Sequence, residues 1–172
     1  MKRFLIISIL SLFSISFAIR SIAEDKVDYK SEFKPSYMGT VEAGHIFPWS
    51  HFLRVTHGMV SLTTSHGVLL KPWLFAGAGL GALTFYHKDA IGFKFPIFLN
   101  GRLTFPKKHF RPFFDLKSGV ILPHYIFFNP VIGYKFAWGK KGGVRLSLGA
   151  YIFTSRSFEK YNGIQATLGF DF

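Results

Sequence analysis

The chain has 172 residues, a formal net charge of +12 and no cysteine, and 19% of its residues are aromatic, with 22 phenylalanines. This length is enough for one domain, and the absence of cysteine excludes a scaffold held together by disulfide bonds. The abundance of Phe, Tyr, Val, Ile and Thr favours strands over a helix bundle.

Residues 1–23 have the form of a secretory signal peptide. Two basic residues precede an apolar stretch over 4–17, which is shorter than the roughly 18 residues that a spanning helix needs. Small-x-small motifs end at Ala18 and at Ala23, and we expect cleavage after Ala23, because a polar stretch follows. The alternative is that the segment stays as a membrane anchor.

Export also constrains the partners of the basic charge. Removal of 1–23 takes away Lys2, Arg3 and Arg20 and leaves a net charge of +9. An exported protein does not meet cellular nucleic acid, so we expect no nucleic-acid partner. The charge is instead predicted to lie at lipid headgroups or anionic surface glycolipid, or to serve only solubility in the turns.

A polar lead over 24–36 precedes segments in which apolar and polar residues alternate, as in half-buried strands. The segments are 37–46, 54–70 (clearest over 59–70), 73–86, 95–105, 111–122, 125–138, 144–153 and 163–172. The connections after the second, fourth and sixth segments are short and turn-like, whereas the others are more varied. This order predicts one antiparallel up-and-down sheet over 37–172, closed into a barrel with no second domain.

Alternation shows that one face is apolar but does not show whether that face points inward or outward. A soluble barrel exterior would carry about 25–35% charged residues, whereas the polar face here consists mostly of Gly, Ser and Thr. The few charges on that face have both signs, as a narrow lumen requires, and are Glu42, Arg102, Asp115, Lys117, Lys135 and Arg145. We therefore predict an all-β, eight-stranded antiparallel transmembrane β-barrel of the outer membrane. A soluble periplasmic lipid-binding barrel is an alternative.

Aromatic residues gather at the segment ends, which predicts the two girdles that mark membrane interfaces. The girdle candidates are Tyr37, Phe47, Trp49, Trp73, Tyr86, Phe105, Phe110, Tyr125, Trp138, Phe153, Tyr161 and Phe172.

The last segment, "GIQATLGFDF", has apolar residues at every second position, including Leu168, Phe170 and Phe172. It is similar to the C-terminal signal of outer-membrane proteins, in which alternating apolar residues precede a final aromatic residue. The similarity implies recognition by the barrel-assembly machinery and a final strand that closes the barrel against the first.

The chain resembles the small outer-membrane β-barrel proteins of the Bacteroidota type, within the porin-like superfamily. The resemblance rests on "TTSHGVLLKPWLFAGAGLG", "PIFLNGRLTF", "PFFDLKSG", "FNPVIGYKF", "LSLGAY" and "GIQATLGFDF". It implies a fold and an outer-membrane location, with outer-membrane lipid and surface glycolipid as neighbours, but it implies no reaction.

Three kinds of chemistry remain as alternatives to a structural barrel. A lipid A-modifying hydrolase or transferase would need a serine, a histidine and an acid, but Ser65 and His66 are adjacent on a strand and point to opposite faces. A metal or haem site would need closer ligand spacing than that of His45, His51, His57, His87 and His124, so we expect no catalytic residue, metal or cofactor. Surface binding of an unknown extracellular ligand would use the longer connections, through Trp49, His51, Phe52, Arg54, Arg156, Phe158 and Lys160.

Overall fold

A computed structural model describes residues 33–48, 58–87, 90–105, 110–123, 125–138, 142–155 and 160–172. The predicted signal peptide and residues 24–32 of the polar lead lie outside these residues. The strands are β1 (Ser36–Pro48), β2 (Met59–Lys71), β3 (Leu74–His87), β4 (Ala90–Thr104), β5 (Phe110–Leu122), β6 (Tyr125–Ala137), β7 (Gly143–Ser155) and β8 (Lys160–Asp171). No helix in the described part of the chain is long and apolar enough to cross a membrane.

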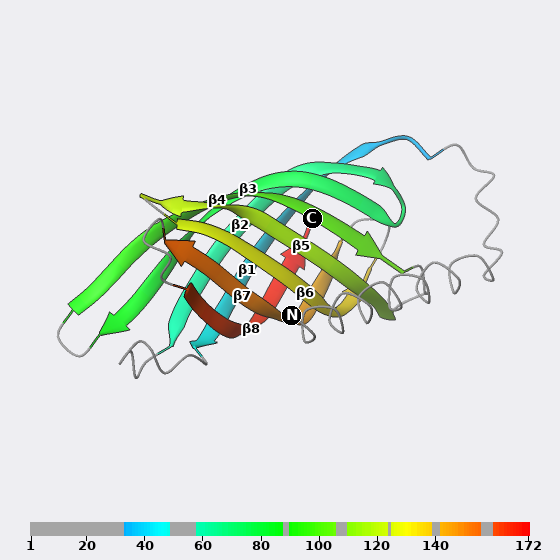
Figure 1. Ribbon diagram of the computed structural model, residues 1–172. Helices are drawn as coiled ribbons and strands as arrows, with labels where there is room; N and C mark the ends of the chain where they lie inside the picture. The colour runs from blue at the N-terminus through cyan, green and yellow to red at the C-terminus, as the bar shows by residue number, and fades with distance from the viewer. Residues whose placement is uncertain are drawn as a thin grey trace, which may run out of the picture. The chain divides into compact units, whose positions relative to one another are not determined.

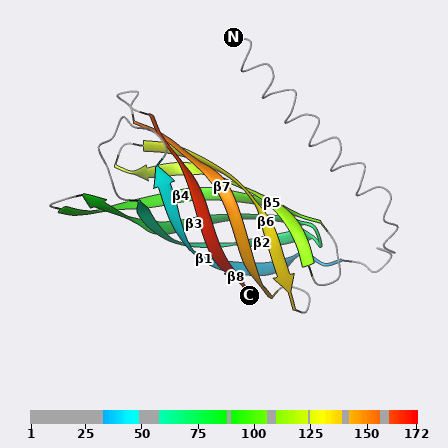
Figure 2. The same cartoon turned by 90° about the horizontal axis from the view of Figure 1, so that it is seen from below.

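The strands form one closed barrel in sequence order, and each strand runs antiparallel to its neighbours (Figure 1). The barrel closes where β1 pairs with β8, from Thr40 opposite Asp171 to Pro48 opposite Gly163. The same closed wall is seen from below in Figure 2. The predicted fold class, an eight-stranded antiparallel barrel, is therefore confirmed.

The predicted start of the fourth strand is wrong, because β4 begins at Ala90 rather than at Phe95. The predicted segments end at Tyr86 and begin again at Phe95, so residues 90–94 fall in the predicted connection; their alternation is short and is interrupted by Gly92. They form a strand because β3 extends equally far and pairs with them, up to His87 opposite Ala90. The resulting β3–β4 hairpin projects beyond its neighbours in both views (Figures 1 and 2).

The up-and-down order gives the barrel two distinct ends. Ser36 and Asp171 lie at the same end as the β2–β3, β4–β5 and β6–β7 connections, and we call this the Ser36 end. The other four connections lie at the opposite end, which we call the Pro48 end.

The wall of the barrel is apolar on its outer face. Among the described residues, more large apolar side chains are exposed than buried, and Leu99 on β4, at 71% exposure, is the most exposed of them. The inward-facing residues include buried charged, polar and aromatic side chains. The described barrel is therefore polar inside and apolar outside over much of its height, which is the reverse of a soluble protein.

Small residues on the inner face make room for the large ones. A Cβ atom on Gly169 would lie 3.1 Å from Arg145 Nη2 and 3.1 Å from Glu42 Cγ. A Cβ atom on Gly79 would lie 2.5 Å from the ring of Phe98. Small and large residues thus alternate across the narrow lumen, as is common in small barrels.

Candidate functional site

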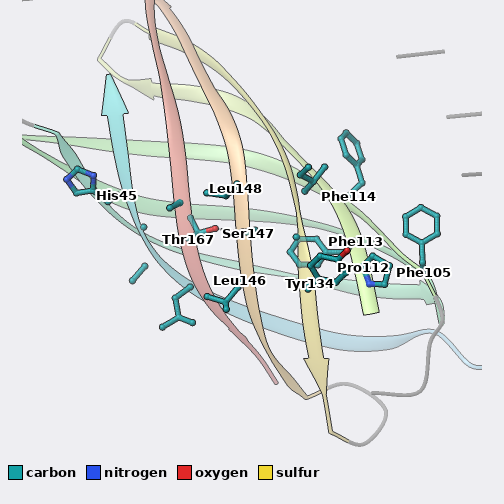
Figure 3. A pocket seen from close by; sticks show the side chains of 16 residues that line it. His45, Phe105, Pro112, Phe113, Phe114, Tyr134, Leu146, Ser147, Leu148 and Thr167 are labelled. Carbon is teal, nitrogen blue, oxygen red and sulfur yellow. Dashed lines mark hydrogen bonds between the residues drawn. The ribbon is translucent and has the colours of Figure 1, made fainter. Parts of the chain in front are cut away.

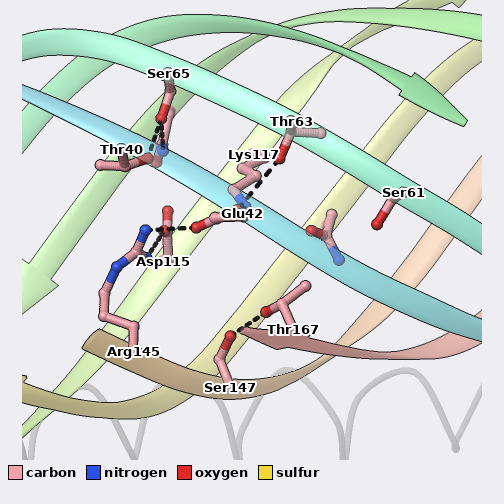
Figure 4. A network of polar contacts seen from close by, with 12 residues as sticks. Thr40, Glu42, Ser61, Thr63, Ser65, Asp115, Lys117, Arg145, Ser147 and Thr167 are labelled. Atoms are coloured by element: carbon pink, nitrogen blue, oxygen red, sulfur yellow. Dashed lines mark hydrogen bonds and ion pairs between the residues drawn. The ribbon is translucent and has the colours of Figure 1, made fainter. Parts of the chain in front are cut away.

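Seven charged side chains meet in the half of the lumen toward the Ser36 end. The structure places all six predicted lumen charges there, each 7% exposed or less. Figure 4 shows Glu42 of β1, Asp115 and Lys117 of β5 and Arg145 of β7 facing one another. The cluster consists of Glu42, Asp115 and Asp171 as acids and Arg102, Lys117, Lys135 and Arg145 as bases.

Arg145 is the centre of this charge cluster. Its guanidinium lies 2.7 Å from Glu42 Oε1, 3.4 Å from Asp115 Oδ2 and 2.8 Å from Asp171 Oδ1. Arg102 contacts the same three carboxylates at 3.9, 3.1 and 3.2 Å. Two guanidinium groups thus bridge all three acids, and this arrangement offsets part of the desolvation cost of each buried charge.

Asp171 belongs to this cluster although it was not among the predicted site residues. It is fully buried and contacts Arg102, Arg145 and Lys135, the last through a 2.7 Å contact between Nζ and Oδ2. The signal was present in the sequence, because Asp171 shares the alternation of Gln165 and Thr167. The remaining pair joins Lys117 to Glu42, which also accepts a hydrogen bond from Thr63.

Neutral polar side chains continue from the charge cluster. Asn100 donates to Ser65, whose hydroxyl also bonds Thr40, and Gln165 donates to Ser61. Nearby, a cavity of about 10 Å³ touches Ser61, Lys117, Asn129 and Gln165, among others. This space is near the lower limit for a single water molecule.

An aromatic plug fills the half of the lumen toward the Pro48 end. Its members are Ile46, Met59, Leu83, Phe98, Ile121, Phe127, Tyr151 and Phe153, with Phe85 and Tyr125 packed against them. Phe127 stacks on Tyr151 with ring centroids 5.5 Å apart, and Phe98 meets Phe127 edge-on at 6.0 Å. The side chains therefore obstruct the lumen by apolar packing at this end, and at the other end by ion pairing together with a small apolar cluster of Met38, Leu69 and Phe75.

Two of the predicted girdle residues, Phe153 and Tyr125, belong to the plug instead, so these two predictions are wrong. Phe153 is 3% exposed inside the lumen, and Tyr125 packs beside it at 5.7 Å between ring centroids. Both face inward because they share the alternation of the lumen residues on their strands. Lys94 lies at the same mouth, with its Nζ 3.6 Å from the centre of the Tyr125 ring.

The Ser–His pair considered for catalysis is divided between the two faces of the wall. Ser65 is buried in the lumen, whereas His66 lies on the outer face between Tyr37 and Thr64. Tyr37 Oη is 2.5 Å from His66 Nδ1, and Thr64 Oγ1 is 3.1 Å from Nε2. The Thr64 hydroxyl donates to the Thr40 carbonyl at 3.0 Å, so its proton points to the backbone of β1 and not to His66.

Among the residues that the structure describes, no Asp or Glu side chain lies beside His66. Every Asp and Glu among the described residues, namely Glu42, Asp115 and Asp171, lies in the lumen. The described part of the chain also holds no group of three or more His, Cys, Asp or Glu side chains able to bind a metal ion. His45 lies on the outer face beside Phe47, at 4.3 Å between ring centroids.

The candidate surface-binding residues are outside this description. Trp49, His51, Phe52, Arg54, Arg156 and Phe158 lie outside the described residues, as do His57 and His124, and nothing is described of the side chains of His87 and Lys160. Of the residues in the predicted assembly signal, Leu168, Phe170 and Phe172 are all exposed on the outer face. The backbone of Phe172 pairs with that of Gly39 on β1 through hydrogen bonds of 2.9 and 3.0 Å.

Comparisons with known proteins find similarity in fold alone. No protein-family model and no curated protein sequence matches the chain. The crystal structure of Neisserial surface protein A is similar with a TM-score of 0.61 and 11% identity, over 81% of this chain and 98% of that one. A de novo designed transmembrane β-barrel is similar with a TM-score of 0.51 and 11% identity, over 81% and 98% of the two chains. The fold is thus one found in transmembrane barrels.

Proposed function

We propose that the chain is an integral outer-membrane barrel protein with a structural or surface-binding role and a lumen closed by its own side chains. The observation that carries the proposal is the division of the wall, with buried ion pairs inside and exposed apolar residues outside. A soluble protein does not expose an apolar surface of this extent to water, whereas a barrel that spans a bilayer needs an apolar outer face. The Ser36 end would then face the periplasm.

Several finer assignments belong to the same proposal. The lumen charges act as a structural core, the segment around Leu168, Phe170 and Phe172 is recognised during barrel assembly, and outer-membrane lipid and surface glycolipid surround the wall. The resemblance to small Bacteroidota-type barrels and the N-terminal export signal support this location. A role as a lipid-modifying enzyme is not favoured, because His66 has no carboxylate partner among the described residues.

Membrane fractionation combined with a heat-modifiability gel tests the proposal. Folded transmembrane barrels resist unfolding by the detergent of the gel until they are boiled. We therefore expect a band in the outer-membrane fraction whose mobility changes on boiling. A protein found only in the soluble periplasm would contradict the proposal and would favour the soluble lipid-binding barrel instead.

A further inference from the structure

A long depression crosses the outer wall of the barrel over strands β5, β6, β7, β8 and β1. It has a volume of about 960 Å³ and is drawn in Figure 3. A second depression of about 350 Å³ adjoins it and shares Phe114, Ile132 and Leu148 with it. The larger one alone is at the upper end of the roughly 300–1,000 Å³ typical of ligand pockets. We call the two together the wall groove.

Small side chains form the floor of the wall groove. Strand pairing sets Ala43 opposite Leu168, Ala166 opposite His45, and Ala150 opposite Ile164. The three alanines therefore lie on a diagonal across β1, β8 and β7. Ala166 is two residues from Leu168, the partner of Ala43, and Ala150 is two residues from Leu148, the partner of Ala166. Larger side chains lie on the β5–β6 side, including Phe114 and Tyr134, which are 37% and 47% exposed. The result is an open depression that contains alanines and leucines and is bordered by aromatic rings on the β5–β6 side.

The lining of the wall groove suits hydrocarbon. The described residues that line it include no Asp, Glu, Lys or Arg, and His45 is the one side chain with an imidazole. A charged headgroup or an acidic peptide would find no ionic partner there and would lose its hydration. A slim, flexible and uncharged chain can follow the diagonal floor and keep contact with both sides.

The position of the wall groove along the barrel indicates which lipid supplies the hydrocarbon chain. The wall groove reaches Phe105 and Pro112, which flank the β4–β5 connection at the Ser36 end. Under the proposed function this end faces the periplasm, so the groove opens toward the leaflet built from phospholipid. It is also continuous with the exposed apolar wall that lipid is expected to cover.

A second copy of the chain fits this surface less well. Within lipid, apolar burial gives no driving force, so any occupant of the groove, lipid or protein, has to be held by close packing or by polar contacts. Two copies related by a twofold axis would set one concave groove against the other and leave a void between them.

We propose that the wall groove holds one acyl chain of a membrane phospholipid as a bound lipid, distinct from the exchanging lipid around the barrel. The inference rests on the proposed function, because it requires the wall to face a bilayer. The groove positions this lipid against β7, β8 and β1, the strands at which the barrel closes.

Native mass spectrometry of the full chain, purified from membranes in mild detergent and mixed with palmitoyl-oleoyl phosphatidylethanolamine, tests the inference. The variant Ala43→Leu/Ala166→Leu fills the floor, and we expect it to retain about tenfold less lipid than the parent, as steric exclusion from an apolar pocket predicts. The matched control is Ala76→Leu/Ala78→Leu on β3, where both alanines are also exposed on the outer face. This control should retain as much lipid as the parent.

The outcomes separate the two proposals. Equal lipid retention in the parent, the groove variant and the control would overturn the bound lipid and leave the membrane barrel intact. A parent dimer that is lost in the groove variant would also overturn it, in favour of a second copy. A parent that shows no heat-modifiable band in the membrane fraction would instead contradict the proposed function. If the double variant does not fold by the same gel, the smaller change Ala166→Val still has to lower retention.

Discussion

In the half of the lumen toward the Ser36 end, seven charged side chains lie beside a small apolar cluster of Met38, Leu69 and Phe75, whereas in the half toward the Pro48 end aromatic and aliphatic side chains fill the space. Both halves are tightly filled, but they differ in what a substitution removes. In the plug, the side chains stabilise the fold mainly through shape complementarity and dispersion contacts, which a side chain of similar shape can largely restore. In the charge cluster, the balance of opposite charges is what stabilises the fold, and a side chain of the same shape without the charge cannot restore it.

The charge cluster is also unbalanced, with four cations and three carboxylates. Removing an acid therefore increases the excess of positive charge, whereas removing a cation neutralises it. This asymmetry makes the two kinds of substitution unequal, although both break ion pairs.

The largest effect is expected for Asp171→Asn, which preserves shape and removes a charge. Asp171 is fully buried and pairs with Arg102, Arg145 and Lys135. We expect a loss of about 3–5 kcal/mol in the free energy of unfolding, as for other broken buried ion pairs. Urea unfolding of the protein in lipid vesicles measures it, and a loss below that of the plug variant described below would contradict the comparison.

A charge placed on the opposite face of the same wall is the second test. Leu99, 71% exposed, precedes the buried Asn100 on β4. If the outer face meets lipid, Leu99→Lys should cost about 2–4 kcal/mol, since lysine is costly at mid-membrane. The depth control is Ile91→Lys near the tip of the β3–β4 hairpin, where the cost should be about 0–1 kcal/mol. Equal costs at both positions would argue against a membrane around β4.

A conservative change in the plug is expected to cost less. Phe127 is 3% exposed and contacts Phe98 and Tyr151. Phe127→Leu keeps most of the volume, so we expect a loss of about 1.5 kcal/mol, measured by the same urea unfolding. A loss as large as that of Asp171→Asn would show that shape and charge matter equally in the two halves.

The sequence anticipated much of the fold because alternation is a local property of a strand. Each strand shows its two faces within a few residues, because one face carries charged or polar residues and the other is apolar, as on β7, where Arg145 and Ser147 alternate with Leu146 and Leu148. The position of the charges was therefore visible before the structure. The pairing of Arg145 with three carboxylates on three other strands was not, because it depends on the register around the barrel.

The plug was missed for a related reason. Near the Pro48 end both faces of a strand are apolar, so alternation loses its contrast, and Tyr125 and Phe153 were assigned to a membrane girdle. The start of β4 was missed because its first residues are strand only through pairing with β3. The local pattern contains neither fact, since each depends on residues that are distant in sequence.

The smallest effect is expected for Lys135→Met, which removes a cation from the edge of the charge cluster. Lys135 pairs with Asp171, but Arg102 and Arg145 still contact that carboxylate after the change. The cluster becomes neutral, so we expect a loss of only about 1 kcal/mol in the free energy of unfolding. A loss equal to that of Asp171→Asn would refute the role of charge balance.

Contact between position 99 and lipid acyl chains is the property that tests the proposed membrane barrel most directly. The chain has no cysteine, so Leu99→Cys provides a single labelling site for an environment-sensitive fluorophore in the vesicle-reconstituted protein. If the outer wall faces lipid, we expect strong quenching by phospholipids brominated on their acyl chains and little quenching by iodide in the water. Quenching by iodide without quenching by the brominated lipids would show that the apolar wall does not face a membrane.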